Sequence, residues 1–187
     1  MKIGITGGIG SGKSYVCSRL QARGIEVYDC DTAAKRLIRT SPDIRQRLTA
    51  LIGPDTYQGD NLCKAVVAKF LLTSEANARA IDDIVHPAVF RDFLDSGLQW
   101  MESAILFESG AYRLVDKVIV VSAPYETRIE RVMRRDGISH QKVLEWMDRQ
   151  LPQDIVRARA DFEIVNDGMA DIDKQLNKIL RKCNRLF

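Results

Sequence analysis

The chain has 187 residues, of which 45% are hydrophobic and 28% are charged, and its formal net charge is +3. This composition is typical of a soluble globular protein, and the length suits one α/β domain with a sizeable core. The small positive charge permits a polyanionic partner without indicating one, and no apolar run is long enough to cross a membrane.

The first element is a short apolar stretch, residues 2–6, which predicts a buried parallel strand. The glycine-rich run 7–14 follows it and fits G-x-x-x-x-G-K-[ST], a motif that binds nucleotide phosphates. Residues 15–23 have apolar positions at helical spacing and end at Gly24, a residue common after helices. A strand before the motif and a helix after it distinguish a phosphate-binding loop from an ordinary glycine-rich turn.

Each residue type in this loop has a chemical reason to be there. Glycines let the backbone turn tightly and point its N–H groups at a phosphate. The helix that begins near Gly12 adds the positive end of its dipole. We expect Lys13 to reach the β- and γ-phosphates and the Ser14 hydroxyl to coordinate Mg²⁺. The residues that we expect to contact the nucleotide here are Gly8, Ile9, Gly10, Ser11, Gly12, Lys13, Ser14 and Tyr15.

Residues 25–28 predict a second strand, which leads into Asp29 and, after one cysteine, Asp31. Ligands of an open parallel sheet bind beyond the carboxyl ends of its strands, so both carboxylates are well placed for chemistry on a phosphate acceptor. For Asp29, a structural and a functional role are equally open. For Asp31 we favour a functional role, because an acceptor hydroxyl needs a nearby carboxylate. The alternative is that Asp31 only caps a helix over residues 32–39.

Residues 41 to about 97 have a mostly helical pattern, which is longer than a simple crossover between two strands. Breaks in the pattern fall at residues 41–42, 53–54 and 59–60. We therefore predict a mostly helical acceptor-binding insertion at residues 31–97, within a single domain that spans residues 1–187. His86 lies in this insertion, and from the pattern alone a capping or packing role is the more common one for a lone histidine.

Three more strands are predicted, over residues 99–104, 117–121 and 162–166, and a terminal helix follows the last of them. Glu102 and Glu108 lie at or after the end of the third strand. If they have no function, we expect both carboxylates to face water. The strands alternate with helical segments along the chain. This alternation predicts an α/β fold, a five-stranded parallel sheet flanked by helices.

A helix is predicted after the fourth strand, and three of its arginines share one face. Arg128, Arg131 and Arg135 have the spacing i, i+3, i+7. Such a face is either a solvated surface or a clamp for a transferring phosphate, a task to which the guanidinium group is well suited. The phosphate-binding loop upstream favours a clamp that contains Arg131 and Arg135.

A second helix follows the first, and the two together have the size of a lid. Gly137 ends the first helix, and Ser139 is an N-cap for the second, which ends near residues 150–152. We therefore predict lid helices over residues 125–150.

The four cysteines contain no C-x-x-C pair and no metal-ligand spacing, so we expect reduced thiols. The first predicted strand starts at residue 2, which leaves no room for a signal peptide. We therefore expect a cytoplasmic protein without a membrane partner.

Several of these stretches, in order and nearly end to end, resemble the dephospho-coenzyme A kinase family. The matching segments are residues 5–14, 29–31, 86–87, 106–108, Arg131, 135–137, Gln150 and 160–166. The resemblance implies a P-loop NTPase fold of the small-kinase type. It also implies the last reaction of coenzyme A biosynthesis, in which ATP with Mg²⁺ phosphorylates the ribose 3′-hydroxyl of dephospho-coenzyme A.

The resemblance further implies roles for individual residues. Asp31 would orient or deprotonate the acceptor hydroxyl, and Arg135 would neutralise charge on the transferring phosphoryl group, which places both with Lys13 in the catalytic set. Asn166 would lie near the adenine of ATP. The residues expected to bind the acceptor are Asp29, Asp31, Lys64, His86, Glu108 and Arg131.

The chain also departs from the family pattern. Lys64 and Trp146 stand where arginine is common, and residues 103–105 replace a run that usually contains proline. Another small-molecule P-loop kinase stays open as an alternative, and a nucleotide-dependent switch or nucleic-acid-binding ATPase is a more remote one. No basic stripe with interleaved aromatic residues is present, so we expect no nucleic-acid partner. The sequence predicts no particular oligomeric state.

Overall fold

The computed structural model describes residues 1–184, and its centre is a five-stranded parallel sheet with the order β2-β5-β1-β6-β7. The strands are β1 (Ile3–Thr6), β2 (Val27–Asp29), β5 (Trp100–Glu102), β6 (Lys117–Ser122) and β7 (Phe162–Val165). All five lie within two residues of their predicted bounds, so the predicted fold class is confirmed. The strand β1 is buried throughout, as expected for a central strand with both faces covered.

The chain divides into two compact units. The first, here called the sheet unit, contains Met1–Tyr28 and the segment that starts at Leu98. The second, here called the helical unit, is Asp29–Gly97, which overlaps the predicted insertion at residues 31–97. No helix within residues 1–184 combines the length and the apolar character that a membrane crossing requires.

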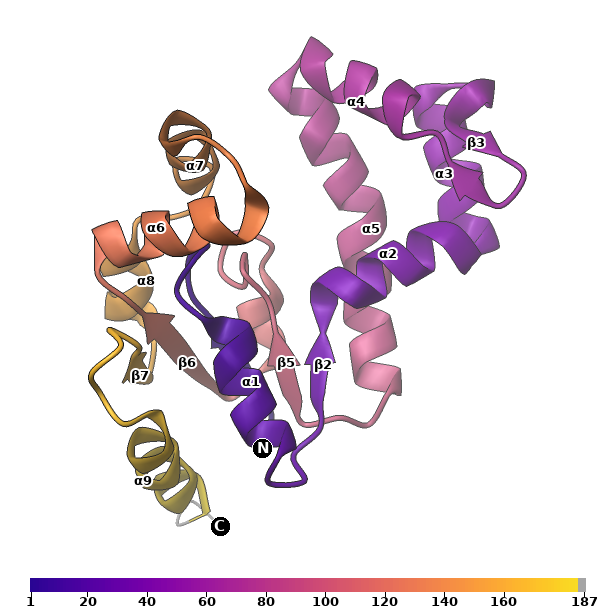
Figure 1. Ribbon diagram of the computed structural model, residues 1–187. Helices are drawn as coiled ribbons and strands as arrows, with labels where there is room; N and C mark the ends of the chain where they lie inside the picture. The colour runs from indigo at the N-terminus through magenta and orange to yellow at the C-terminus, as the bar shows by residue number, and fades with distance from the viewer. Residues whose placement is uncertain (185–187) are drawn as a thin grey trace. The chain divides into compact units, whose positions relative to one another are not determined.

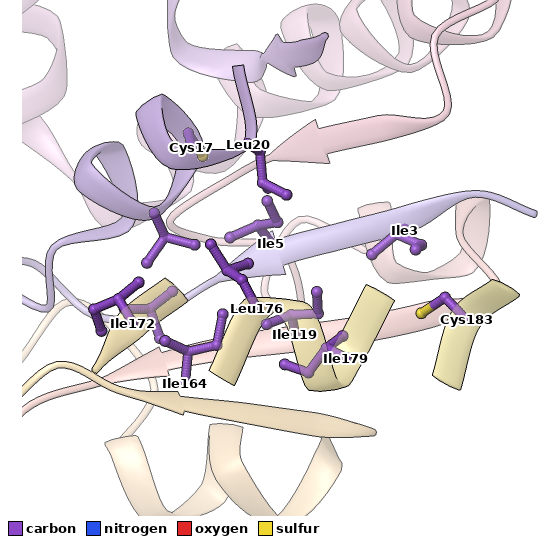
Figure 2. Packing of buried hydrophobic residues seen from close by; sticks show 12 residues of the cluster. Ile3, Ile5, Cys17, Leu20, Ile119, Ile164, Ile172, Leu176, Ile179 and Cys183 are labelled. Carbon is purple, nitrogen blue, oxygen red and sulfur yellow. The ribbon is translucent and has the colours of Figure 1, made fainter. Parts of the chain in front are cut away.

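The main core of the sheet unit lies between the sheet and two helices, α1 (Lys13–Gln21) and α9 (Ile172–Asn184). Figure 2 shows their side chains converging on the strands. Ile5 and Ile119 come from adjacent strands, and Leu20 of α1 and Leu176 of α9 are fully buried with them. The apolar positions of both helices recur every three or four residues, which is why each helix can bury one face.

Further elements complete the sheet unit. Leu106 packs on Gly4 of β1, where a Cβ would lie 2.9 Å from the leucine side chain. The 3₁₀ helix η2 (Ala111–Leu114) follows, and α8 (Gln153–Arg159) precedes β7. The helix α8 was not predicted, because it is short and buries one residue, Val156, so it has no clear apolar repeat.

The predicted lid segment forms two helices with a small core of their own, α6 (Tyr125–Asp136) and α7 (His140–Met147) (Figure 1). The predicted end of the first helix at Gly137 and the N-cap of the second at Ser139 are confirmed, but the second helix ends at Met147, before the predicted end near residues 150–152. Gly137 follows α6 with a left-handed φ of 64°, and the Ser139 side chain accepts a hydrogen bond from the Lys142 N–H at the start of α7. The core between the helices contains Ile129, Val132, Val143 and Met147, with Ile9 of the phosphate-binding loop packed against it.

The helical unit has its own core. Its helices are α2 (Cys30–Thr40), α3 (Pro42–Ile52), α4 (Lys64–Thr73) and α5 (Glu75–Asp95), with η1 (Pro54–Thr56) and a hairpin of β3 (Tyr57–Gln58) and β4 (Asn61–Leu62). Ile44 and Leu48 of α3 pack with Ile84 of α5. The hairpin was not predicted, because two-residue strands are too short to show an alternating pattern. Its turn contains Gly59, at a position where the sequence indicated only a break.

The C-terminal helix α9 is joined to α1 by one carboxylate. Asp173 accepts hydrogen bonds from Arg19 at 3.0 Å and from Arg23 at 2.6 Å, and a second Arg19 nitrogen pairs with its other oxygen. The hydrogen bonds from Arg19 and Arg23 lower the pKa of Asp173 to about 2. The two helices that cover the main core are therefore linked at their surface by an ion-pair group.

This pKa shift predicts how the stability of the protein depends on acid. The ion pairs of Asp173 stabilise the fold above the ordinary aspartate pKa of about 3.9, and the contribution is lost as the pH falls toward the folded-state value. We expect Asp173→Asn to melt below the wild type at neutral pH, and the difference in melting temperature to close as the pH falls from about 4 to about 2. Asp148 is exposed and its carboxylate has no ion pair within residues 1–184, so Asp148→Asn provides a control that should show no such convergence. A difference between wild type and Asp173→Asn that stays constant down to the lowest pH would contradict the prediction.

Candidate active site

Several positions of the loop between β1 and α1 accept only glycine, among them Gly10 and Gly12. Gly10 has a φ of 79° and Gly12 a φ of 93°, both in the left-handed region that disfavours other residues. Neighbouring atoms also leave no room for a side chain at either position. A Cβ on Gly10 would collide with the backbone of Arg128, and a Cβ on Gly12 would collide with the side-chain amide of Asn166. The loop conformation is thus imposed by the elements packed around it.

This loop presents polar groups that lack a partner. The N–H groups of Gly10, Gly12 and Ser14 donate to no acceptor within residues 1–184. The Ser11 hydroxyl is fully buried and likewise has no hydrogen-bond partner in this part of the chain. Buried polar groups in native proteins are nearly always bonded, so these donors fit an anion bound at the start of α1.

Lys13, at the first position of α1, points back over the loop. Its Nζ donates a hydrogen bond to the Gly7 carbonyl at 2.8 Å and lies 3.8 Å from Glu102 Oε1. The Glu102 side chain is only 15% exposed, so the interpretation of this carboxylate as water-facing was wrong. Glu102 is the last residue of β5, which pairs with β1. Because the loop follows β1, the end of β5 lies beside the loop. In the sequence, Glu102 could be recognised only as an acidic residue at the end of a predicted strand. Its position beside the loop follows only when the strand order is known.

Two side chains of the lid segment hold the loop at one residue, Ile9. Gln150 Oε1 accepts a hydrogen bond from the Ile9 N–H at 2.8 Å, and Arg128 Nε donates one to the Ile9 carbonyl at 2.9 Å. Gln150 also donates to the Ala104 carbonyl at 3.4 Å. Both backbone groups of Ile9 are therefore bonded to the protein itself, and the expected contact of Ile9 with the nucleotide stays a prediction.

The loop is supported from the end of β7 as well. Asn166 Nδ2 donates to the Ser11 carbonyl at 2.8 Å, and Arg131 Nη1 donates to the Asn166 carbonyl at 3.0 Å. Both predicted site residues thus lie at the loop. The Asn166 amide fixes the backbone beside Gly12, and its expected contact with adenine stays a prediction.

Two other predicted residues of the sheet unit have partners away from the loop. Arg135 donates to both carboxylate oxygens of Asp136, at 2.8 and 2.7 Å, and its side chain is 62% exposed. This pairing raises the pKa of Arg135 and lowers that of Asp136. Glu108 Oε1 accepts a hydrogen bond from the Leu151 N–H at 2.9 Å, after the end of α7. The structure therefore gives Arg135 and Glu108 local partners, and their catalytic and acceptor-binding roles stay predictions.

In the helical unit, the structure distinguishes the two aspartates at the start of α2. Asp29 is the N-cap of α2, since its carboxylate accepts hydrogen bonds from the Thr32 N–H at 3.0 Å and the Thr32 hydroxyl at 2.8 Å. The helix begins at Cys30, two residues earlier than predicted, so the hypothesis that Asp31 is the cap was wrong. Asp31 lies in the first turn of α2, is exposed, and forms no hydrogen bond with the described residues.

The remaining candidates of the helical unit lie on α4 and α5. His86 Nε2 lies 3.6 Å from Asp82 Oδ1, and its ring stacks on Phe90 with a centroid distance of 6.1 Å. The helix α5 runs through Pro87 without ending there. Lys64 is the first residue of α4 and is exposed. A role of either side chain in acceptor binding stays a prediction.

Comparisons with known proteins give a consistent result. A family model described as dephospho-CoA kinase matches residues 1–171. The dephospho-CoA kinase of Porphyromonas gingivalis is 43% identical over 171 residues, which cover 88% of this chain and 85% of that protein. A solved structure from Thermus thermophilus, TT1252, has a TM-score of 0.85 and 31% identity, covering 97% of this chain and 96% of that one. The dephospho-CoA kinase of Campylobacter jejuni has a TM-score of 0.68 at 21% identity, with 99% and 98% of the two chains covered, which shows a shared fold.

The packing around Gly12 predicts the effect of a single methyl group. Gly12 and Gly24 both have a left-handed φ, 93° and 76°, but no atom lies within 4 Å of a Cβ placed on Gly24. We expect Gly24→Ala to lose about 1–2 kcal/mol of stability from backbone strain alone. ADP should still raise the melting temperature of this variant. Gly12→Ala should lose more, because it also displaces Asn166, and ADP should no longer raise its melting temperature. Thermal unfolding with and without ADP measures both effects, and equal losses in the two variants would show that the packing around Gly12 is unimportant.

Proposed function

The chain belongs to the dephospho-CoA kinase family, and we propose how its residues perform the reaction of that family. It is an ATP-dependent kinase that transfers phosphate to the ribose hydroxyl of dephospho-CoA, the last step of coenzyme A biosynthesis. The observation that supports the proposed residue roles most directly is the loop before α1. Its N–H groups and its buried Ser11 hydroxyl that lack a partner within residues 1–184 fit a phosphate chain.

The loop is proposed to bind the phosphates of ATP through Gly8 to Ser14. A phosphoryl group in transfer carries its charge on peripheral oxygens, so catalysis depends on positioning and on charges aimed at those oxygens. Lys13 is the loop cation proposed for this task, and its present partners, the Gly7 carbonyl and Glu102, hold it over the loop. Arg131, bonded to the Asn166 carbonyl, lies beside the same loop and is proposed to add a second positive charge. Tyr15, 53% exposed in the first turn of α1, is proposed to contact the nucleotide from outside the loop.

The loop also contains a donor suited to Mg²⁺, the exposed Ser14 hydroxyl. Within residues 1–184 no group of three or more His, Cys, Asp or Glu side chains could hold a metal ion. Mg²⁺ needs no such protein cage, since it commonly takes one or two protein oxygens together with substrate phosphates and water. We propose that Ser14 supplies the protein oxygen. Mg²⁺ bound there would offset the negative charge of the phosphates during transfer.

The acceptor residues are proposed to be those that the resemblance names, most of which lie in the helical unit. Asp31 has a carboxylate in the first turn of α2 that is exposed and not used as a cap, so it is available to orient the ribose hydroxyl and take its proton. Asp29 is proposed to fix the start of that helix through Thr32. Lys64 and His86 are proposed to bind the remainder of the acceptor. Glu108 is proposed to support acceptor binding through its bond to Leu151.

The lid helices α6 and α7 are proposed to deliver Arg135 to the transferring phosphate. Arg135 is mostly exposed and bonded to its neighbour Asp136, so a bound phosphate would have to replace that partner.

Arg135→Gln should therefore lower kcat while leaving the affinity for ADP nearly unchanged. An unaltered kcat would contradict the role proposed for this arginine.

The substrate assignment predicts the outcome of a transfer assay. With ATP labelled in its γ-phosphate, label should pass to dephospho-CoA and not to AMP, adenosine or shikimate, and added nucleic acid should not raise ATP turnover. Lys13→Ala should reduce transfer by at least about 10²-fold, since a preorganised positive contact to the reacting phosphate commonly contributes that much. Its circular dichroism spectrum should match the wild type. Transfer to another acceptor in preference to dephospho-CoA would overturn the assignment.

A matched pair of aspartates tests the role of Asp31. Asp31 and Asp43 are each the second residue of a helix, α2 and α3, and both are exposed. Asp31→Asn should lower kcat by about 10²–10⁴-fold, the usual span for general acid–base catalysis, while ADP binds as in the wild type. Asp43→Asn removes the same charge from an equivalent helix position and should leave kcat unchanged. Wild-type kcat in Asp31→Asn would show that its carboxylate is not needed.

A further inference from the structure

Arg128 of α6 is a buried cation without a carboxylate partner. The residue is 6% exposed, and no aspartate or glutamate within residues 1–184 forms an ion pair with it. Among the described residues its side chain donates one hydrogen bond, from Nε to the Ile9 carbonyl at 2.9 Å. The two terminal nitrogens of the guanidinium group, Nη1 and Nη2, have no acceptor in this part of the chain.

The guanidinium group lies directly against the phosphate-binding loop. Its Cζ atom is 2.8 Å and its Nη1 atom 3.4 Å from the place that a Cβ on Gly8 would occupy, and Nη2 is closer still. The backbone of Arg128 fills the space beside Gly10 in the same way. The absence of side chains at Gly8 and Gly10 is therefore what lets this residue approach the loop.

This charge is largely withdrawn from water in the free protein. Burial lowers the pKa of Arg128, and the nearby Tyr125 opposes this only in part. Buried charges in proteins are normally paired, because removing an ion from water without a partner costs free energy. A neutral residue at this position could pack against the loop without that cost. The arrangement becomes favourable when an anion binds to the loop.

We propose that Arg128 is a positioning residue for the nucleotide phosphates. Its bond to Ile9 fixes the first half of the loop, and its unpaired charge is stabilised by the phosphates that the loop binds. The inference rests on the proposed function of the loop and extends it, because neither the family resemblance nor the predicted clamp of Arg131 and Arg135 gives Arg128 a role.

The competing explanation is that Arg128 only braces the loop. The two explanations differ in what they predict for the free protein. If Arg128 is only a brace, Arg128→Gln should lower the melting temperature without ligand and leave phosphate binding nearly unchanged. If its charge serves the bound phosphates, Arg128→Gln should melt at or above the wild-type temperature without ligand, because an uncompensated charge has been removed.

The experiment compares wild type, Arg128→Gln, Arg128→Lys and Arg134→Gln by thermal unfolding and by titration with ADP, pyrophosphate and adenosine. Arg134 is the control, since it lies on the same helix and is exposed. We expect Arg128→Gln to weaken ADP and pyrophosphate binding by about 10- to 100-fold, the range for a lost interaction with a charged group. Adenosine, which has no phosphate, should bind as to the wild type. Arg128→Lys should recover most of the affinity, and Arg134→Gln should behave as the wild type.

Each other outcome has a defined meaning. Unchanged ADP affinity in Arg128→Gln overturns the proposal, and so does an equal loss of adenosine affinity, which would indicate a contact with the base. If Arg128→Gln lowers both stability and ADP affinity, Arg128→Lys decides. Restored affinity supports a role of the charge, and unrestored affinity overturns it. Failure of ADP and pyrophosphate to bind the wild type would instead refute the proposed function of the loop.

Discussion

The structure of the candidate site depends on the backbone of the loop between β1 and α1, which is held from several sides. Lid side chains Arg128 and Gln150 bond the two polar groups of Ile9, and Asn166 bonds the Ser11 carbonyl. The N–H groups at the start of α1 have no partner among the described residues. A backbone fixed in this way needs little reorganisation when it binds an anion, which is the main requirement for electrostatic catalysis.

Positive side chains outnumber negative ones around this loop, as binding of a phosphate requires. Lys13, Arg128 and Arg131 all contact the loop or the residue next to it, whereas Glu102 is the acidic side chain that pairs with Lys13. A surplus of positive charge close to partly buried backbone is unfavourable in the free protein and becomes favourable with a bound nucleotide. The lid segment therefore has two functions in this structure. It packs a small core of its own against Ile9, and it brings arginines to the loop.

Much of this arrangement was predictable from local sequence patterns. The motif at residues 7–14 indicated the loop and its ligand, because its glycines, Lys13 and Ser14 have that combination of spacing and chemistry in few other contexts. The helix ends at Gly137 and Ser139 were also predicted, since a left-handed glycine and a side-chain cap act within a few residues of the backbone they serve. Resemblance to a family added the acceptor and the reaction, which no local pattern contains.

By itself, then, the sequence determined the five strands, the phosphate-binding loop and the class of reaction, because these depend on short-range chemistry or on motifs kept in order along the chain. Only the tertiary structure decided which residues surround the loop. The strand order placed Glu102 beside Lys13, and the packing of α6 buried Arg128, although the helical spacing treated it as equivalent to two other arginines. The start of α2 at Cys30 made Asp29 the cap and left Asp31 available. The positions of Glu102 and Arg128 depend on contacts between residues far apart in the chain. The choice between Asp29 and Asp31 as the cap depends on competition between two nearby residues. Local sequence patterns encode neither.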